Sequence, residues 1–181
     1  MGMIITIAVI VIILLYVIVT YNSFIKLRNW VGESWSQIDV QLKRRHDLIP
    51  NLVNTVKGYA KHESETLEKI VQARNQLVSG TPQERMDADH EIQGALKSIF
   101  ALQEAYPDLK ANQSFLDLQN ELTETENKVA YSRQLYNSTV ASYNIKRESF
   151  PSNIIASIFS FKKKDLLAIP EAERAVPTVE F

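Results

Sequence analysis

The sequence predicts an all-α protein, in which an N-terminal transmembrane helix is followed by an antiparallel four-helix bundle of long helices. Three observations support this fold class. Residues 3–19 (MIITIAVIVIILLYVIV) carry no charge, apolar residues recur at intervals of three and four along much of the remaining chain, and only five glycines and six prolines occur among 181 residues. Such periodicity with few chain-breaking residues favours long helices over short strands.

The apolar run is long enough to anchor the chain in a membrane. With its two following residues it approaches the ~20 residues that a helix needs to cross the hydrocarbon core. A secretory signal would place basic residues before such a run, but the first basic residue here is Lys26. We therefore expect an uncleaved anchor over residues 1–22. Because Lys26 and Arg28 follow it, the positive-inside rule predicts an N-terminus outside the cell and a body in the cytoplasm.

One apolar stripe continues from the anchor to about His46: Phe24, Leu27, Val31, Trp35, Ile38 and Leu42. The sequence predicts that the first helix ends there. Asp47 would cap a second helix, and Pro50 would occupy its first turn, where a missing backbone N–H costs little. The basic turn Lys43–Arg45 would then lie at a helix C-terminus, where the macrodipole favours cations.

Two later breaks separate the remaining helices. Ser79–Pro82 combines a glycine stop, a threonine cap and a proline at the first helical position, and Tyr106–Pro107 interrupts the chain again. The breaks predict a third helix from Pro82 to Ala105 and a fourth from Asp108 to Ser149. Because the connections are short, residues 23–150 are expected to form the bundle.

The fourth predicted helix carries a heptad pattern typical of a coiled coil. Its stripe alternates spacings of four and three: Phe115, Gln119, Leu122, Glu126, Val129, Arg133, Tyr136, Val140 and Tyr143. Polar side chains at core positions need partners, which neighbouring helices would supply. The predicted polar layer consists of Asp39, Arg44, Gln119, Glu126 and Arg133. Three alternatives stay open for it: it fixes the register of the bundle, it holds a ligand or active site, or part of it faces solvent because the stripe is out of phase.

The sequence contains no recognisable catalytic or cofactor motif. The three histidines, His46, His62 and His90, lack the spacing of metal ligands on one helix face, and no GxGxxG, GxxxxGK[ST] or GxSxG motif occurs. The absence of cysteine excludes disulfides, thiolate catalysis and Cys–zinc sites. Twenty Lys and Arg against 21 Asp and Glu give a net charge of −1, which argues against nucleic-acid binding. We predict a non-enzymatic protein without metal or cofactor.

Two segments follow the predicted bundle. Residues 151–164 (PSNIIASIFSFKKK) join a short apolar cluster to three lysines and are too few to span a bilayer. Because the first helix leaves the membrane, an antiparallel fourth helix returns to it. The segment is expected either to lie in the interface of the anionic leaflet or to pack onto the bundle. Residues 165–181 are expected to be extended or disordered.

Several long blocks resemble a known family. They are WSQIDVQLKRRHDLIPNLVNTVKGYAKHE (residues 35–63), EAYPDLKANQSFLDLQNELTETENKVAYSRQLYN (104–137), FPSNIIA (150–156) and the closing PTVEF. With the N-terminal anchor, they make the chain resemble the LemA family of bacterial membrane proteins. The resemblance implies a mostly helical bundle behind one span of the bacterial plasma membrane, a cytoplasmic body, an association with envelope processes and membrane organisation, and no catalytic residues.

Two hypotheses for the function follow. The first is a membrane-anchored scaffold or adaptor on the lipid bilayer, which forms a homo-oligomer through its long heptad helix or docks a second membrane protein. The tail residues Pro177, Val179 and Phe181 would contact the partner, either as an added edge strand or by inserting the terminal phenylalanine and carboxylate. Alternatively, the tail packs on its own bundle. The second hypothesis is a peptide- or lipid-binding protein, or an enzyme, that uses the polar layer in the bundle core.

Overall fold

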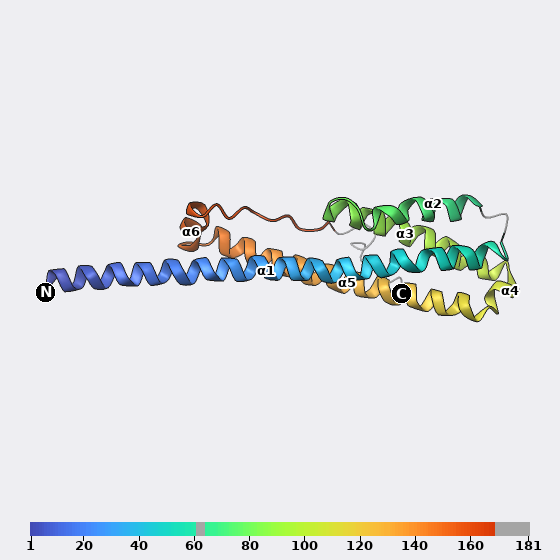
Figure 1. Ribbon diagram of the computed structural model, residues 1–181, viewed down its shortest axis with the longest axis horizontal. Helices are drawn as coiled ribbons and strands as arrows, with labels where there is room; N and C mark the ends of the chain where they lie inside the picture. Colours follow the sequence, from blue (N-terminus) through green and yellow to red (C-terminus); the bar gives the residue numbers. More distant parts are fainter. Residues whose placement is uncertain (61–63, 169–181) are drawn as a thin grey trace, which may run out of the picture. The chain divides into compact units, whose positions relative to one another are not determined.

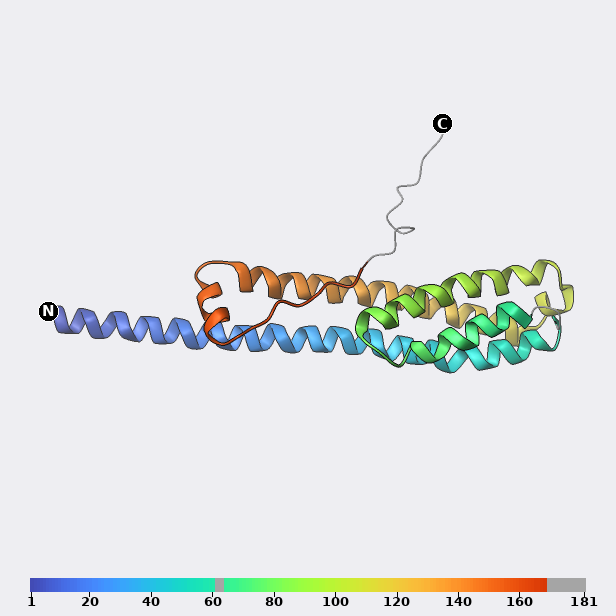
Figure 2. The ribbon, with the colours of Figure 1, turned by 90° about the horizontal axis from the view of Figure 1, so that it is seen from above.

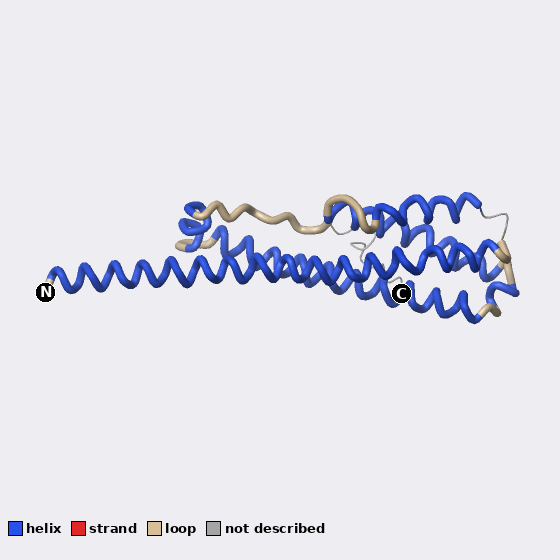
Figure 3. Tube along the Cα trace, viewed as in Figure 1, coloured by secondary structure: helices blue, strands red, loops and turns tan. Residues whose placement is uncertain are grey.

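A computed structural model describes residues 1–60 and 64–168, and the regular structure of these residues is entirely helical (Figures 1 and 3). This confirms the all-α class and the long apolar helix at the N-terminus. The elements are α1 (Gly2–Lys57), α2 (Ser64–Gln76), α3 (Pro82–Ala101), the 3-10 turn η1 (Leu102–Glu104), α4 (Pro107–Lys110), α5 (Gln113–Glu148) and α6 (Ser152–Ile158).

The chain divides into two compact units. The first unit consists of Met1–Ser36 and Arg133–Leu166, and the second of Gln37–Ser132 with the last described residues, Leu167 and Ala168. The long helices α1 and α5 each contribute one part to each unit. The first unit therefore holds the apolar stretch, and the second holds α2, α3 and α4.

The predicted break near His46 is wrong, because α1 continues through Pro50 to Lys57. The second helix, expected from Asp47 to about Ser79, is instead the shorter α2, which begins at Ser64. A proline inside a helix lacks the N–H that would bond to the carbonyl four residues earlier, here that of His46. In this protein the Arg74 side chain of α2 replaces the missing donor, since its Nε donates to the His46 carbonyl over 2.8 Å. A tertiary hydrogen bond thus satisfies the group that the proline leaves unpaired.

The start of α3 confirms the cap predicted at Thr81. The Thr81 hydroxyl accepts from the Glu84 N–H, and the Glu84 carboxylate accepts from the Thr81 N–H, which together form a capping box with Pro82 at the first position. Gly80 supplies the turn with a φ of +96°, which favours glycine. Backbone freedom and a side-chain cap therefore end one helix and begin the next.

The last two predicted boundaries are shifted. The third helix ends at Ala101 and tightens into η1, and the fourth begins at Gln113 instead of Asp108 because Pro107–Lys110 forms a separate turn. The Asn112 side chain accepts from the Phe115 N–H over 3.0 Å and so caps α5. This asparagine, five residues after the proline, is the signal that fixes the true start of the long helix.

Within the first unit, α1 and α5 run antiparallel. Phe24 lies edge-on to Tyr143 with ring centroids 6.0 Å apart, and further along the pair Trp35 meets Tyr136, also at 6.0 Å. No side chain of residues 3–19 is buried, whereas burial begins abruptly at Thr20. By length and composition α1 can cross a membrane, and the change in burial marks where its apolar stretch ends.

The core of the second unit draws on four helices. Apolar side chains of α1, α2, α3 and α5 are removed from solvent together, which supplies the main favourable term for folding. The fully buried members include Leu42, Ile49, Leu52, Ile70, Ile92, Ile99 and Phe115. Leu42 and Phe115 belong to the apolar stripes predicted from the sequence, so the hydrophobic pattern and the packing agree at these positions.

Candidate functional site

A fully buried arginine lies at the centre of the second unit. Arg45 of α1 is 0% exposed and its Nη1 lies 2.5 Å from Oδ1 of Asp89 on α3, itself 1% exposed. The Arg45 Nε donates to Thr125 Oγ1 on α5, and Nη2 donates to the Leu122 carbonyl, each over 3.4 Å. Three helices thus meet at one guanidinium, which we call the Arg45 cluster.

Each polar group of the Arg45 cluster has a partner. Thr125 accepts from Arg45 and donates its own proton to the Leu122 carbonyl over 2.7 Å. The second oxygen of Asp89 accepts from Gln93 Nε2 over 3.2 Å. A buried charge is tolerated only when it is paired and hydrogen-bonded in this way. The cluster is therefore a buried ion pair whose polar groups are all hydrogen-bonded.

A second arginine, Arg85 of α3, ties α3 to α1. Arg85 pairs with Asp39 of α1, and its Nε donates to the Leu77 carbonyl over 2.7 Å. Because Leu77 directly follows α2, one side chain connects the end of that helix to α1 and α3. Asp39 keeps about half of its side chain in solvent, so this pair is less desolvated than the Arg45 cluster.

The five residues of the predicted polar layer do not share one cluster. Asp39 joins Arg85, whereas Arg44 lies 3.5 Å from Glu121 with both side chains nearly half exposed. Gln119 and Glu126 are partly buried in the second unit, and Arg133 is buried in the first. Any ligand-binding role of this layer stays a prediction. Pro177, Val179 and Phe181 lie outside the described residues.

Sequence reasoning missed the residues that do form the buried cluster, although a signal was present. Arg45 continues the apolar stripe of α1, three residues after Leu42 and four before Ile49. The expected helix end at His46 moved Arg45 to a solvated terminus and hid this position. On α5 the buried polar position is Thr125 rather than its neighbour Glu126, so the heptad was read one residue out of phase there.

A groove of about 490 Å³ with a mixed polar and apolar lining lies along α2 and α3 in the second unit. Its walls include Lys69 and Gln72 from α2, and Glu91, Gly94 and Ser98 from α3. Lys69 already pairs with Glu65 over 2.8 Å. Among the residues that the structure describes, no group of His, Cys, Asp or Glu could hold a metal ion.

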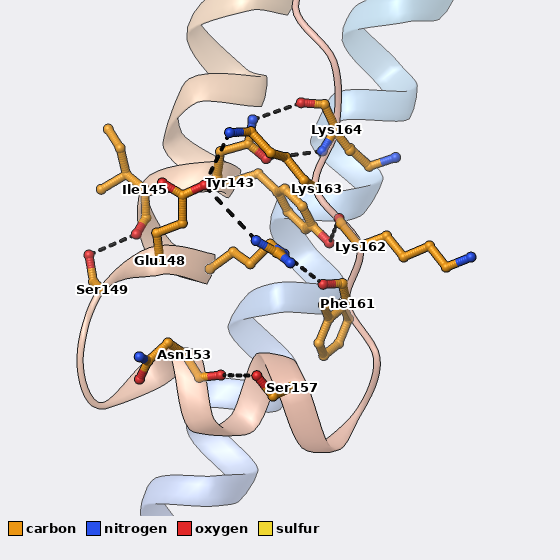
Figure 4. A network of polar contacts seen from close by, with 12 residues as sticks. Tyr143, Ile145, Glu148, Ser149, Asn153, Ser157, Phe161, Lys162, Lys163 and Lys164 are labelled. Carbon is orange, nitrogen blue, oxygen red and sulfur yellow. Dashed lines mark hydrogen bonds and ion pairs between the residues drawn. The ribbon is translucent and has the colours of Figure 1, made fainter.

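A second polar network lies in the first unit, where the chain after α6 runs back along α5 (Figure 4). Asn144 Nδ2 donates to the Lys164 carbonyl over 2.7 Å, and Asn144 Oδ1 accepts from the Lys164 N–H over 3.0 Å. The Tyr143 hydroxyl donates to the Lys162 carbonyl over 3.0 Å, and Arg147 Nε donates to the Phe161 carbonyl over 2.9 Å. Side chains of α5 thus hold the backbone of residues 161–164.

Burial raises the pKa of the Tyr143 phenol. The hydroxyl therefore remains protonated across the physiological pH range, as its bond to the Lys162 carbonyl requires. The same segment is fixed by aromatic contacts to α1, because Phe161 stacks on Phe24 with ring centroids 4.7 Å apart. Polar and aromatic contacts together place the lysine-rich segment beside α1.

Replacing Asn144 with leucine is expected to release this segment. Both hydrogen bonds to the Lys164 backbone disappear, and the free energy of unfolding should fall by about 1–3 kcal/mol. Amide hydrogen exchange of Lys164 measures the effect directly and should accelerate. Gln134→Leu, at an exposed position of α5 in the same unit, is the matched control and should leave this amide protected. Equal protection in the two variants would contradict the role assigned to Asn144.

Comparison with known proteins gives a consistent assignment. A profile of the LemA family matches residues 34–181. Protein LemA of Metamycoplasma hominis is 29% identical over 158 residues, which cover 84% of this chain and 71% of that protein. Magnetosome protein MamQ 2 of Paramagnetospirillum magneticum is 26% identical over 172 residues, covering 80% of this chain and 63% of the relative.

A further magnetosome protein, MamQ of Magnetospirillum gryphiswaldense, is 24% identical over 170 residues, covering 79% of this chain and 62% of that relative. The chain therefore spans less than two thirds of the length of these two magnetosome proteins. The family profile, by contrast, covers most of the chain and includes the residues of the Arg45 cluster and the segment held by Asn144. The resemblance read from the sequence is confirmed, and the chain belongs to the LemA family.

Proposed function

We propose that the protein is a membrane-anchored, non-enzymatic scaffold or adaptor in bacterial membrane organisation. One observation carries the proposal. Within the first unit, the exposed apolar stretch and the residues of α1 that pack on α5 belong to one uninterrupted helix. A partner that binds the first unit would therefore be held at the membrane by the same helix that carries the apolar stretch. Relatives named Protein LemA and magnetosome proteins are consistent with a membrane-associated role.

The finer architecture proposed is an antiparallel four-helix bundle. In the second unit, Arg45 of α1 meets Asp89 of α3, and Asp39 meets Arg85. The residue numbers of the paired positions increase in the same direction along both helices, so α1 and α3 run parallel to each other. Since α2 lies between them in the chain, alternating directions of consecutive helices support the up-down-up-down topology.

The proposed orientation places the body in the cytoplasm of the bacterium and the N-terminus outside. The first unit contains eight Lys or Arg and three Asp or Glu, hence a formal charge of +5, while the whole chain carries −1. Positive charge beside a span favours the cytoplasmic side. Self-assembly or docking of a second membrane protein would then use exposed apolar side chains of the second unit, such as Val40 and Tyr131.

The test compares the full chain with a shortened chain that lacks residues 1–22, by size exclusion with light scattering in mild detergent. We expect the full chain to resist alkaline extraction from membranes and to form a defined oligomer. The shortened chain should appear in the soluble fraction, and retention of its oligomer would assign assembly to the body. A full-length protein that is extracted by alkali, or that is monomeric and captures no membrane protein after cross-linking, would overturn the proposal.

A further inference from the structure

We infer that α6 and its flanking residues form a second membrane contact, which inserts an apolar face into the leaflet where α1 emerges and binds anionic lipid head groups through adjacent lysines. The inference rests on the proposed anchoring by α1 and adds a site to it. We call residues Phe150–Lys164 the α6 corner. Its apolar part enters the bilayer interface, and its basic part lies at the level of the head groups.

The α6 corner lies at the end of the apolar stretch of α1, as both views of the first unit show (Figures 1 and 2). The Tyr21 ring lies 4.8 Å from that of Phe159 and 5.7 Å from that of Phe161, centroid to centroid. Tyr21 follows Val19, the last exposed residue of the stretch, by only two positions. At 1.5 Å per residue this is roughly 3 Å along the axis, so α6 reaches the interface of a bilayer whose hydrocarbon core is about 30 Å thick.

The outer face of the α6 corner is apolar although it is largely exposed to solvent. Ile154 is 50% exposed and Ile158 is 66% exposed, and their spacing of four residues places them on one face of α6, while Phe150, in the turn just before α6, is 81% exposed. The opposite face is already buried, with Ile155 and Ala156 against the rest of the unit. The buried face already packs α6 against the first unit, so the exposed apolar side chains add no stability to the protein in water. An exposed apolar surface of this kind indicates an interaction site.

Lysines lie on the chain segments next to α6. Lys146 donates to the Ser23 hydroxyl, directly after the span, and its Nζ lies 5.7 Å from the centre of the Phe24 ring. Lys162, Lys163 and Lys164 follow the aromatic pair on the segment that Tyr143 and Asn144 hold by its backbone. The backbone from which the three lysine side chains extend is thus held at Lys162 and at Lys164. Glu148 meets Lys163 over 3.3 Å, but the first unit retains its excess of five positive charges.

Continuity with the span identifies the occupant as lipid. A surface that begins within one helical turn of a membrane anchor is presented to the bilayer whenever the anchor is inserted. The basic residues match the negative potential of an anionic leaflet, which attracts Lys and Arg close to the surface. A second copy of this chain would carry the same positive charge on the same unit and would be repelled. Lipid can contact the apolar face with its acyl chains and bind the lysines with its anionic head groups.

The first arm of the test places a fluorescent probe on the apolar face of the full-length protein. The chain has no cysteine, so Ile158→Cys provides a single labelling site for a nitrobenzoxadiazole probe. In vesicles of phosphatidylcholine and phosphatidylglycerol, the emission is expected to shift to the blue and to be quenched several-fold by lipids brominated near the head group. Ser138→Cys, exposed on α5 of the same unit, is the matched control and should show neither effect.

Two results of this arm would overturn the inference. Emission from position 158 as water-like as that from position 138 would show that the apolar face stays outside the bilayer. A probe that is shielded but not quenched by brominated lipid, with shielding that grows with protein density, would identify another copy as the occupant. In either case alkaline extraction still reports on the anchoring by α1, so failure of the α6 corner and failure of the proposed function are distinguishable.

The second arm tests the lysines in the same labelled protein. Lipid quenching at position 158 should be stronger with phosphatidylglycerol than in pure phosphatidylcholine. The combined substitution Lys162→Gln, Lys163→Gln and Lys164→Gln should abolish this difference. The matched control replaces Lys57, Lys69 and Lys97, exposed lysines of the second unit, and should preserve it. If phosphatidylglycerol changed the quenching equally in the two triple variants, the lysines of the α6 corner would not bind head groups, and that part of the inference would be wrong.

Discussion

Replacing Asp89 with alanine is expected to lower the free energy of unfolding by about 3–5 kcal/mol, because it leaves the Arg45 guanidinium buried without its carboxylate. Arg45 is 0% exposed and cannot turn to solvent without moving α1 from α3 and α5. Single domains are stable by only about 5–15 kcal/mol, so this one change removes a large share. Chemical denaturation of the full chain in detergent, followed by circular dichroism, measures the loss.

Two controls separate burial from charge in this experiment. Glu121→Ala removes the acid of the Arg44–Glu121 pair, whose partners lie 3.5 Å apart and nearly half exposed, and should cost less than about 1 kcal/mol. The double variant Arg45→Met with Asp89→Leu replaces both charges by apolar groups and should unfold with a free energy close to that of the natural chain, or above it. An Asp89→Ala variant no less stable than Glu121→Ala would contradict the structural account of the Arg45 cluster.

The double variant also addresses why the cluster is charged. If the pair serves only stability, the apolar version should retain a single well-ordered state. If the pair fixes the register of the helices, the double variant should remain stable while its amide spectrum broadens into several forms. The second outcome is expected, because one guanidinium contacts α3 and α5 together, whereas apolar side chains would accept neighbouring registers equally well.

Many of the helices could be predicted from the periodicity of apolar residues and from helix caps and helix-breaking residues. The apolar stretch of α1, the capping box at Thr81 and the end of α5 before Pro151 each depend on residues close together in sequence. Helix propensity and side-chain caps decide these features, and both depend on residues close together in the chain. They can therefore be predicted from a single sequence. The same holds for the buried positions of α5, where an alternation of four and three identifies Leu122 and Val129.

The features that escaped prediction depend on partners far away in the chain. The Arg45 cluster joins residues separated by 44 and 80 positions, and the Asn144 clamp requires the chain to double back after α6. The membrane position of the α6 corner was left open for the same reason. Its inner contacts with Tyr21 and Phe24 become visible only once helices are placed side by side.

The continuity of α1 leads to the second prediction, a coupling between Pro50 and Arg74. Pro50→Ala should raise the free energy of unfolding by roughly 1–3 kcal/mol, because alanine restores an N–H donor for the His46 carbonyl and removes the clash of a proline ring inside a helix. Arg74→Met alone should lower it by about 1–2 kcal/mol, since the His46 carbonyl then loses its donor on the partly buried side of α1.

The two substitutions together decide whether Arg74 acts through that carbonyl. In the Pro50→Ala background the restored backbone bond already satisfies His46, so Arg74→Met should cost no more than a few tenths of a kcal/mol, the scale expected of independent surface changes. The double-mutant cycle should therefore give a coupling of about 1 kcal/mol or more. Arg74→Met with equal cost in both backgrounds would show that Arg74 stabilises α2 by other means, and the passage of α1 through Pro50 would then need a different physical cause.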